Sequence, residues 1–265
     1  MCEPTMLFRP FGIEGPKIVL FGEKTGDWNP VCFQEPGDHK RNTGLYFRLD
    51  NLSHQYGFRQ IAMPTLTDCN TKVCCREDFA VSIQDGFGTV VLERGVRADG
   101  MILEHSFTGA IASADCPTIV VCCPTSKSVI VAHGGCKSLI DVNHILFYNP
   151  PRENESVVDE IMKMAKLYRF CQVKVFITCG ISGKNYAFPD LIQAVTDRFG
   201  KDCVSDGSGI DLKKVIAKQF SRYNVLDITT DILDTYGDCN IKGEPLWHSY
   251  RRNKTPERNL VLVIN

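Results

Sequence analysis

The sequence predicts an α+β fold in which mixed β-sheets are covered by helices on the outside. Short apolar segments, each bounded by small or turn-forming residues, crowd the first half of the chain and are typical of buried strands. Amphipathic helical patterns dominate the second half, and strands and helices do not follow a strict βαβ order. Because we find no internal repeat and no clear linker, we expect residues 1–265 to form one domain.

Most of the expected strands lie in the first half. Residues 17–25 predict a strand that ends in a polar turn around Gly26. Residues 42–56 have the apolar spacing of an amphipathic helix that ends at Gly57. Further strands are expected at 58–66, 89–93, 100–103, 109–116, 117–124 and 128–135.

The second half contains the clearest helices. Residues 155–170 place apolar side chains on one helical face, and Ser156 can cap the N-terminus of this helix. Two more helices are expected at 189–199 and 211–223. Buried strands are expected at 173–180 and 260–264.

Composition excludes some classes of partner. The chain has 30 basic and 31 acidic side chains, so we expect no electrostatic binding of nucleic acid or membranes. No apolar segment approaches the ~18 residues of a membrane span. The thirteen cysteines include two adjacent pairs, which make a poor disulfide framework, and the N-terminal segment lacks the apolar stretch of a secretory signal. We therefore expect reduced thiols and a cytoplasmic location.

Two reactive side chains stand at the ends of expected strands. Cys116 ends the segment 109–116, and His133 lies near the end of the segment 128–135. At neighbouring strand ends they could form a thiolate–imidazole pair or two ligands of a zinc ion. A buried cysteine is also common as a small hydrophobic side chain, and a histidine at a strand end is commonly solvated, so the sequence leaves both interpretations open.

The densest basic cluster is Tyr250-Arg251-Arg252, followed by Lys254 and Arg258. One interpretation is a solvated loop. The other is a clamp for phosphate or carboxylate, because a guanidinium group matches these oxygen pairs with two parallel hydrogen bonds.

Several short motifs, taken in this order, resemble the laccase-domain family, also called the YfiH type. They are Ala98-Asp99-Gly100, Ala114-Asp115-Cys116, Ala132-His133-Gly134-Gly135, the early glycine turn at 21–27, Ile210-Asp211-Leu212 with Gln219-Phe220, and His248-Ser249-Tyr250-Arg251-Arg252. The resemblance covers nearly the whole chain. It implies a single-domain YfiH-like fold, related to that of the cytotoxic necrotizing toxins.

The resemblance also implies an enzyme of purine metabolism. Such proteins cleave adenosine, inosine, guanosine or methylthioadenosine with phosphate to the base and the sugar 1-phosphate, and they deaminate adenosine. The implied cofactor is zinc, held by a His-Cys-His set whose second and third positions are Cys116 and His133 here. The first position falls on Cys69, which is itself a possible zinc ligand. Copper is less suitable, because six scattered histidines are too few for a multicopper cluster.

By resemblance, Cys116, His133, Lys137 and Arg251 are assigned to catalysis, and Asp115, Ser249, Tyr250 and Arg252 to substrate binding. Lys137 replaces an arginine of the family pattern, so it keeps the charge but loses the bidentate geometry.

Two alternatives remain. In a metal-free cysteine hydrolase or deamidase, Cys116 would be the nucleophile and His133 the base. In a non-catalytic relative, the scaffold would only bind a nucleoside or a partner protein. The second alternative is motivated by the missing first histidine and by Cys136-Lys137-Ser138, which replaces a Trp-Arg-Gly sequence of the family.

Overall fold

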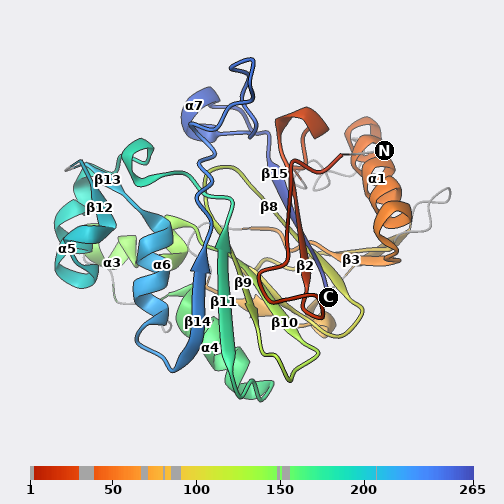
Figure 1. Cartoon of the computed structure of the whole chain (residues 1–265), viewed down its shortest axis with the longest axis horizontal. Coiled ribbons are helices and arrows are strands. Elements are labelled where there is room, and N and C mark those ends of the chain that lie inside the picture. Colours follow the sequence, from red (N-terminus) through yellow and green to blue (C-terminus); the bar gives the residue numbers. More distant parts are fainter. Residues whose placement is uncertain are drawn as a thin grey trace.

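The computed structural model describes residues 3–29, 39–66, 71–79, 81–84, 91–147, 150, 156–206 and 208–265. Two mixed β-sheets pack against each other through a shared apolar core, and helices cover their outer faces (Figure 1). The predicted α+β fold with helices outside mixed sheets is confirmed.

The first sheet has seven strands in the order β1-β2-β15-β8-β3-β6-β5. Its strands, in chain order, are β1 (Met6–Phe8), β2 (Lys17–Phe21), β3 (Gln60–Ala62), β5 (Val81–Gln84), β6 (Val91–Arg94), β8 (Thr108–Ser113) and β15 (Asn259–Ile264). The C-terminal strand β15 therefore lies in the middle of the sheet, between β2 and β8.

The second sheet has six strands in the order β14-β11-β9-β10-β7-β4. They are β4 (Val73–Cys74), β7 (Gly100–Leu103), β9 (Thr118–Cys122), β10 (Val129–His133), β11 (Val173–Thr178) and β14 (Val225–Thr230). A separate pair is formed by β12 (Val204–Ser205) and β13 (Gly209–Ile210).

The alternation of side chains along each strand builds three apolar layers. In β10, Val129 and Val131 face the other sheet, whereas Ile130 and Ala132 face the helices. Since successive side chains of a strand point to opposite faces, a strand that is buried on both faces must be apolar at every position. This explains the uninterrupted apolar segments of the sequence.

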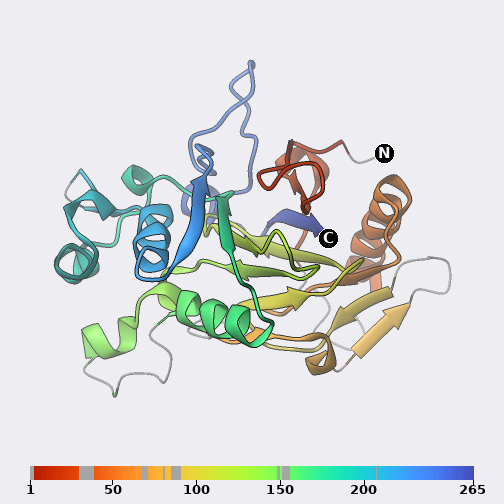
Figure 2. The ribbon, with the colours of Figure 1, turned by 60° about the horizontal axis from the view of Figure 1, so that its bottom comes forward.

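Helices cover both outer faces. Helix α1 (His39–Tyr56) packs on the first sheet through Leu45, Leu49 and Leu52, and it ends before Gly57. Figure 2 shows α1 on one side of the molecule and α4 on the other. The remaining α-helices are α2 (Cys136–Leu139), α3 (Val142–Phe147), α4 (Val157–Leu167), α5 (Ile192–Phe199), α6 (Leu212–Phe220) and α7 (Tyr250–Asn253). Short 3₁₀ turns lie at Glu23–Thr25, Arg76–Asp78, Gly183–Asn185, Pro189–Leu191 and Lys201–Cys203.

The expected helices and strands of the second half are present, and Ser156 caps α4 by accepting a hydrogen bond from the Asp159 amide. Strand β14 was not predicted. It runs parallel to β11 at the edge of its sheet, and α5 and α6 lie between the two strands in the chain. Because an edge strand keeps part of its surface in water, its sequence VLDITT lacks the continuous apolar character of the central strands.

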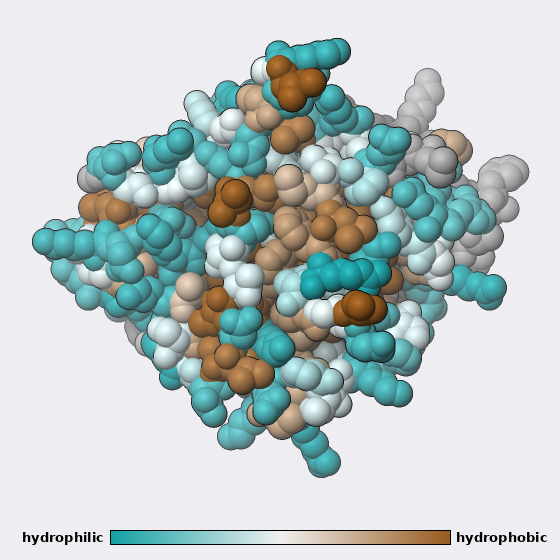
Figure 3. All heavy atoms as spheres, viewed as in Figure 1, coloured by the Kyte–Doolittle hydropathy of each residue, from teal (hydrophilic) through white to brown (hydrophobic). Residues whose placement is uncertain are grey.

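The surface is mixed in character. Figure 3 shows hydrophilic side chains spread over one face of the molecule, with apolar groups between them. Within the described ranges, no helix is long and apolar enough to span a membrane.

Candidate active site

The register of three strands gathers the candidate residues at one end of the second sheet. Strand β10 ends at His133, which is paired with Thr118 at the start of β9, and Cys116 lies just before that strand. On the other side of β10, Gly100 of β7 is paired with Ala132, and the carbonyl oxygen of Asp99 accepts a 2.6 Å hydrogen bond from the His133 amide. Because β7 and β9 both run antiparallel to β10, their first residues meet its last residue.

His133 lies between an aspartate and a cysteine. Its Nδ1 atom is 3.3 Å from Oδ1 of the fully buried Asp99, whose other oxygen accepts a 2.6 Å hydrogen bond from Ser138 Oγ. A second side-chain hydrogen bond joins His133 to Cys116. With Nδ1 directed at the carboxylate, Nε2 is the ring atom left for the sulfur, so the three side chains form an Asp–His–Cys line.

This environment changes the charge of the imidazole. Burial by itself lowers the pKa of His133, but negative charge on Cys116 and the hydrogen bonds to Asp99 and Cys116 outweigh burial and raise this pKa to about 10. The surroundings of the ring therefore favour its protonated form, and the ring lies directly beside the Cys116 sulfur.

Two glycines allow the chain to turn closely around this line. A Cβ atom on Gly134 would lie 2.7 Å from Ile216 Cδ1, and one on Gly135 would lie 2.6 Å from His133 Cε1. A larger residue at position 135 would displace the His133 ring, and one at position 134 would push against Ile216. Gly135 leads directly into α2, in which Cys136 is buried and Lys137 is exposed.

Arg251 reaches the same region from α7. Its guanidinium carbon lies 4.6 Å from the centre of the Tyr186 ring, and the two side chains also share a hydrogen bond. Tyr186 in turn hydrogen-bonds to Cys136. Burial, followed by negative charge on Cys116 and Cys136, raises the pKa of Tyr186 above its ordinary value, so the phenol stays protonated.

Asp115 forms hydrogen bonds with other residues of the protein. Its carboxylate accepts hydrogen bonds from Thr235 Oγ1 at 2.9 Å and from the Arg251 amide at 2.7 Å, and its carbonyl oxygen accepts one from the Ile181 amide at 2.7 Å. The residue is buried and has a left-handed backbone, with φ of 77°. These contacts give Asp115 a positioning role for α7 and Arg251.

The other predicted substrate-binding residues surround α7. Ser249 is fully buried and caps the helix by accepting a hydrogen bond from the Arg252 amide, and Tyr250 is half exposed with Lys254 over its ring. The Arg252 guanidinium donates to the carbonyl oxygens of Tyr236 and Trp247 and pairs with a glutamate near the N-terminus. Ser249 and Arg252 thus hold the fold together, whereas Arg251 contacts the region of Cys116 and His133.

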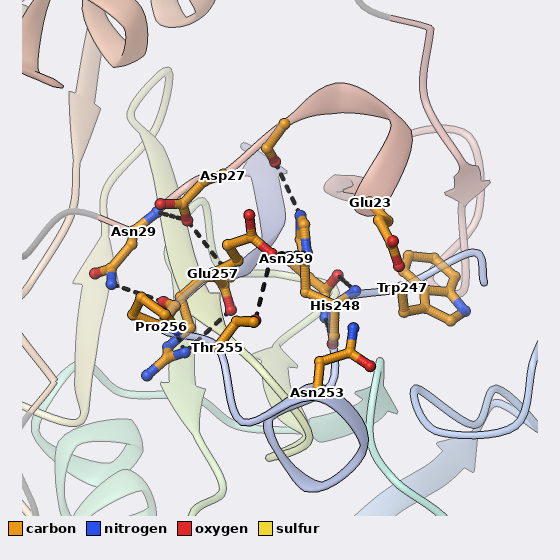
Figure 4. Close-up of polar contacts among 12 residues, drawn as sticks. Glu23, Asp27, Asn29, Trp247, His248, Asn253, Thr255, Pro256, Glu257 and Asn259 are labelled. Carbon is orange, nitrogen blue, oxygen red and sulfur yellow. Dashed lines mark hydrogen bonds and ion pairs between the residues drawn. The ribbon is translucent and has the colours of Figure 1, made fainter. Parts of the chain in front are cut away.

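The segment that carries α7 is anchored on the early glycine turn (Figure 4). Asp27 Oδ1 accepts a 3.0 Å hydrogen bond from the Arg258 amide, and His248 Nε2 lies 3.2 Å from the Gly26 carbonyl oxygen. His248 and Asn259 exchange two 2.8 Å hydrogen bonds. Two motifs more than two hundred residues apart in the chain therefore form one support.

The two adjacent arginines should behave differently when replaced. We expect Arg252→Ala to lower the free energy of unfolding by about 2–4 kcal/mol, because it leaves two carbonyl oxygens and Glu23 without their donor. The control Arg251→Ala should cost no more than about 1 kcal/mol, the scale of a partly exposed cation–π contact. Urea unfolding measures both, and equal losses would contradict this division of roles.

Two of the described residues are of the kind that zinc accepts, and they would supply only part of its ligands. Within the described ranges no group of three or more His, Cys, Asp or Glu is arranged to hold a metal ion. Cys116 and His133 are two ligands that zinc accepts, and Asp99 on the far ring nitrogen is the usual partner of a metal-binding histidine. The third predicted ligand, Cys69, lies outside the described residues.

Sequence reasoning did not assign a site role to Asp99 or Tyr186. Asp99 directly precedes the apolar strand β7, and a buried carboxylate needs a hydrogen-bond partner. Its position in the sequence could therefore have been used to predict a polar contact at this strand end. Tyr186 lies in an irregular segment, and nothing in its sequence neighbourhood indicates a contact with α7.

The fold is shared with three solved bacterial structures. Protein NMB0706 of Neisseria meningitidis, described as a DUF152 protein, is 14% identical and superposes with a TM-score of 0.67 over 98% of both chains. The hypothetical protein YfiH of Bacillus licheniformis is 14% identical, with a TM-score of 0.65 over 94% of this chain and 92% of that one. YlmD of Geobacillus stearothermophilus is 16% identical, with a TM-score of 0.67, and the match covers 100% of this chain and 97% of that one.

The two-sheet fold of this chain is thus the fold of the YfiH-type structures. A family model described as multi-copper polyphenol oxidoreductase laccase matches residues 80–264, and the chain belongs to this family. No curated protein sequence matches the chain. The family predicted from the short motifs is confirmed.

Proposed function

We propose that this protein is a purine nucleoside phosphorylase that uses phosphate to cleave adenosine, inosine, guanosine or methylthioadenosine, with zinc at Cys116 and His133. The observation that carries the proposal is the position of Arg251. Its guanidinium stacks on Tyr186, beside the Cys116–His133 pair. Phosphate is an anionic nucleophile, and a fixed cation next to the reacting centre both binds and orients it.

The surrounding residues have defined tasks in this proposal. Arg251 binds the phosphate oxygens, and Asp115 holds its backbone in place. Lys137, exposed on α2, adds a second positive charge close to Cys136. Zinc, when bound, supplies a Lewis acid that polarises oxygen or activates water. His133 must lose its proton to bind the metal, so zinc binding releases protons.

Replacing Arg251 by lysine tests its role. We expect Arg251→Lys to raise the KM for phosphate by about 10-fold or more, because lysine keeps the charge but loses the bidentate geometry. The KM for the nucleoside should change less. Arg59→Lys is the matched control, since Arg59 is exposed beside β3. An unchanged KM for phosphate in Arg251→Lys would remove Arg251 from the phosphate site.

The function itself is tested by chromatography of adenosine incubated with reduced, zinc-loaded protein, with and without phosphate. Adenine that appears only with phosphate supports phosphorolysis. Inosine in both samples supports deamination by water at the zinc site, the further activity that the resemblance implies. If folded, zinc-loaded protein yields neither product, the phosphorylase proposal is wrong and the non-catalytic alternative gains support.

One observation favours a second candidate, a metal-free cysteine hydrolase or deamidase. The Asp99–His133–Cys116 line has the order of an orienting carboxylate, a base and a nucleophile. In this candidate Cys116 attacks a carbonyl or amide carbon, and the protonated His133 donates to the leaving group. Activity that survives chelation and is lost on alkylation of Cys116 by iodoacetamide would favour this candidate.

A further inference from the structure

Two cysteines outside the candidate active site lie in contact. The Sγ atoms of Cys123 and Cys171 are 3.5 Å apart, although 48 residues separate them in the chain. Cys123 is buried and follows the last residue of β9, whereas Cys171 is exposed in the turn between α4 and β11. The Thr125 hydroxyl lies 3.2 Å from the first sulfur and 2.9 Å from the second.

Strand pairing fixes this contact. Cys122, the last residue of β9, is paired with Lys174 near the start of β11, and the two strands are antiparallel. The residue after β9 and the residues before β11 therefore lie at the same end of the sheet. The neighbouring Cys122 behaves differently. Its side chain faces the apolar core between the two sheets, and burial raises the pKa of its thiol to about 12. Of this adjacent pair, only Cys123 meets a second sulfur in the described contacts.

The surroundings of Cys123 favour a thiolate. Burial raises the pKa of Cys123, but hydrogen bonds from the Thr125 side chain, from the backbone of Gln172 and Thr125, and from Cys171 outweigh burial and lower this pKa to about 6. A thiolate with a neighbouring thiol in contact is the arrangement from which disulfides form.

We propose that Cys123 and Cys171 form a redox-active dithiol, which a peroxide converts into an intramolecular disulfide and a small thiol reductant restores. This site lies beyond the end of β9 that is opposite to Cys116. Its chemistry is therefore independent of the proposed phosphorylase activity.

The oxidation balances with one peroxide for each pair. The pair loses its first proton from Cys123, and proton exchange across the 3.5 Å contact between the sulfurs lets the accessible Cys171 sulfur act as the nucleophile. It attacks one peroxide oxygen, the O–O bond breaks, and the departing hydroxide takes the proton of Cys123 and leaves as water. The Cys123 thiolate then attacks the Cys171 sulfenic acid. An S–S bond forms, and the second hydroxide leaves as water with a proton from solvent.

Peptide mapping under non-reducing conditions tests the proposal. Full-length protein is treated with one equivalent of hydrogen peroxide, and free thiols are blocked before digestion. We expect a cross-linked peptide pair that contains Cys123 and Cys171, in monomeric protein, and its disappearance after dithiothreitol. The rate of thiol loss should rise about tenfold between pH 5 and pH 7, following the thiolate fraction of a group with a pKa of about 6.

Variants separate this pair from the other thiols. Cys171→Ser and Cys123→Ser should each abolish the cross-link, and Cys239→Ser, which removes another exposed cysteine, should leave it unchanged. Three results would each overturn the proposal: sulfinic acid on Cys171 while Cys123 stays a free thiol, disulfide-linked dimers through Cys171, or a cross-link of Cys123 to a different cysteine. Because the mapping uses the wild-type protein, it remains decisive even where a variant fails to fold.

Discussion

Cys116→Ala is expected to lower kcat/KM by at least about 10³-fold, the scale on which loss of an essential group acts. Its sulfur is hydrogen-bonded to His133 and is also a proposed zinc ligand, so both the phosphorylase and the hydrolase candidates depend on it. Zinc retained after desalting should fall in the same variant, because two described ligands are reduced to one. Kinetics and metal analysis on the same preparation measure both effects.

Two further variants make this result interpretable. Cys239→Ala removes an exposed cysteine of the 236–246 loop and should preserve both zinc and turnover. Cys116→Ser separates the loss of the zinc ligand from the loss of the hydrogen bond, since an alcohol is a poor ligand for zinc but can still accept the hydrogen bond of His133. If Cys116→Ala keeps both its metal and its turnover, the assigned site is wrong.

Asp99→Asn is expected to have the second largest effect. The carboxylate of Asp99 accepts a hydrogen bond from Nδ1 of the His133 ring. The asparagine amide would either turn its NH₂ group towards Nδ1, so that the acceptor is lost, or favour the tautomer that carries its proton on Nε2. We expect zinc affinity and kcat to fall by about 10- to 100-fold, as is usual for the partner of a metal-binding histidine. The KM for phosphate should stay nearly unchanged, because Arg251 is held by Asp115 and not by Asp99.

Ser138→Ala is the matched control. It removes the 2.6 Å hydrogen bond to the other Asp99 oxygen but leaves the contact with His133 intact. A loss of about 1 kcal/mol in stability with little change in zinc affinity is expected. Equal effects of the two substitutions on zinc affinity would show that Asp99 acts only as a buried structural group.

The sequence predicted the strand ends better than the contacts between them. Cys116 and His133 could be identified because apolar segments end near them. Strand β10 does end at His133, whereas β8 already ends at Ser113 and Cys116 lies in the turn before β9. The contact of Asp99 with His133 depends on β7 lying beside β10, and local patterns do not encode which strands become neighbours. Arg251 and Tyr186 meet only because the chain returns past β14 to α7.

Motif matching identified residues but not their contacts. Asp115, Ser249 and Arg252 are predicted to bind substrate, and in the structure their polar atoms form hydrogen bonds that hold α7 and its neighbouring loops. Their role towards a substrate stays a prediction. A short motif records which side chains are present, whereas the direction of each hydrogen bond depends on the folded backbone around it. Adjacent residues can therefore have entirely different contacts, as the guanidinium groups of Arg251 and Arg252 do.

The contacts of Asp115 link the two halves of the candidate site mechanically. Asp115 and Cys116 are consecutive, so the side chain that holds the Arg251 amide and the side chain that meets His133 extend from Cα atoms joined by one peptide bond. Because the trans peptide unit is rigid, these two Cα atoms keep a fixed separation of about 3.8 Å. The anchor of α7 and the thiol beside His133 therefore start from neighbouring points of one short segment.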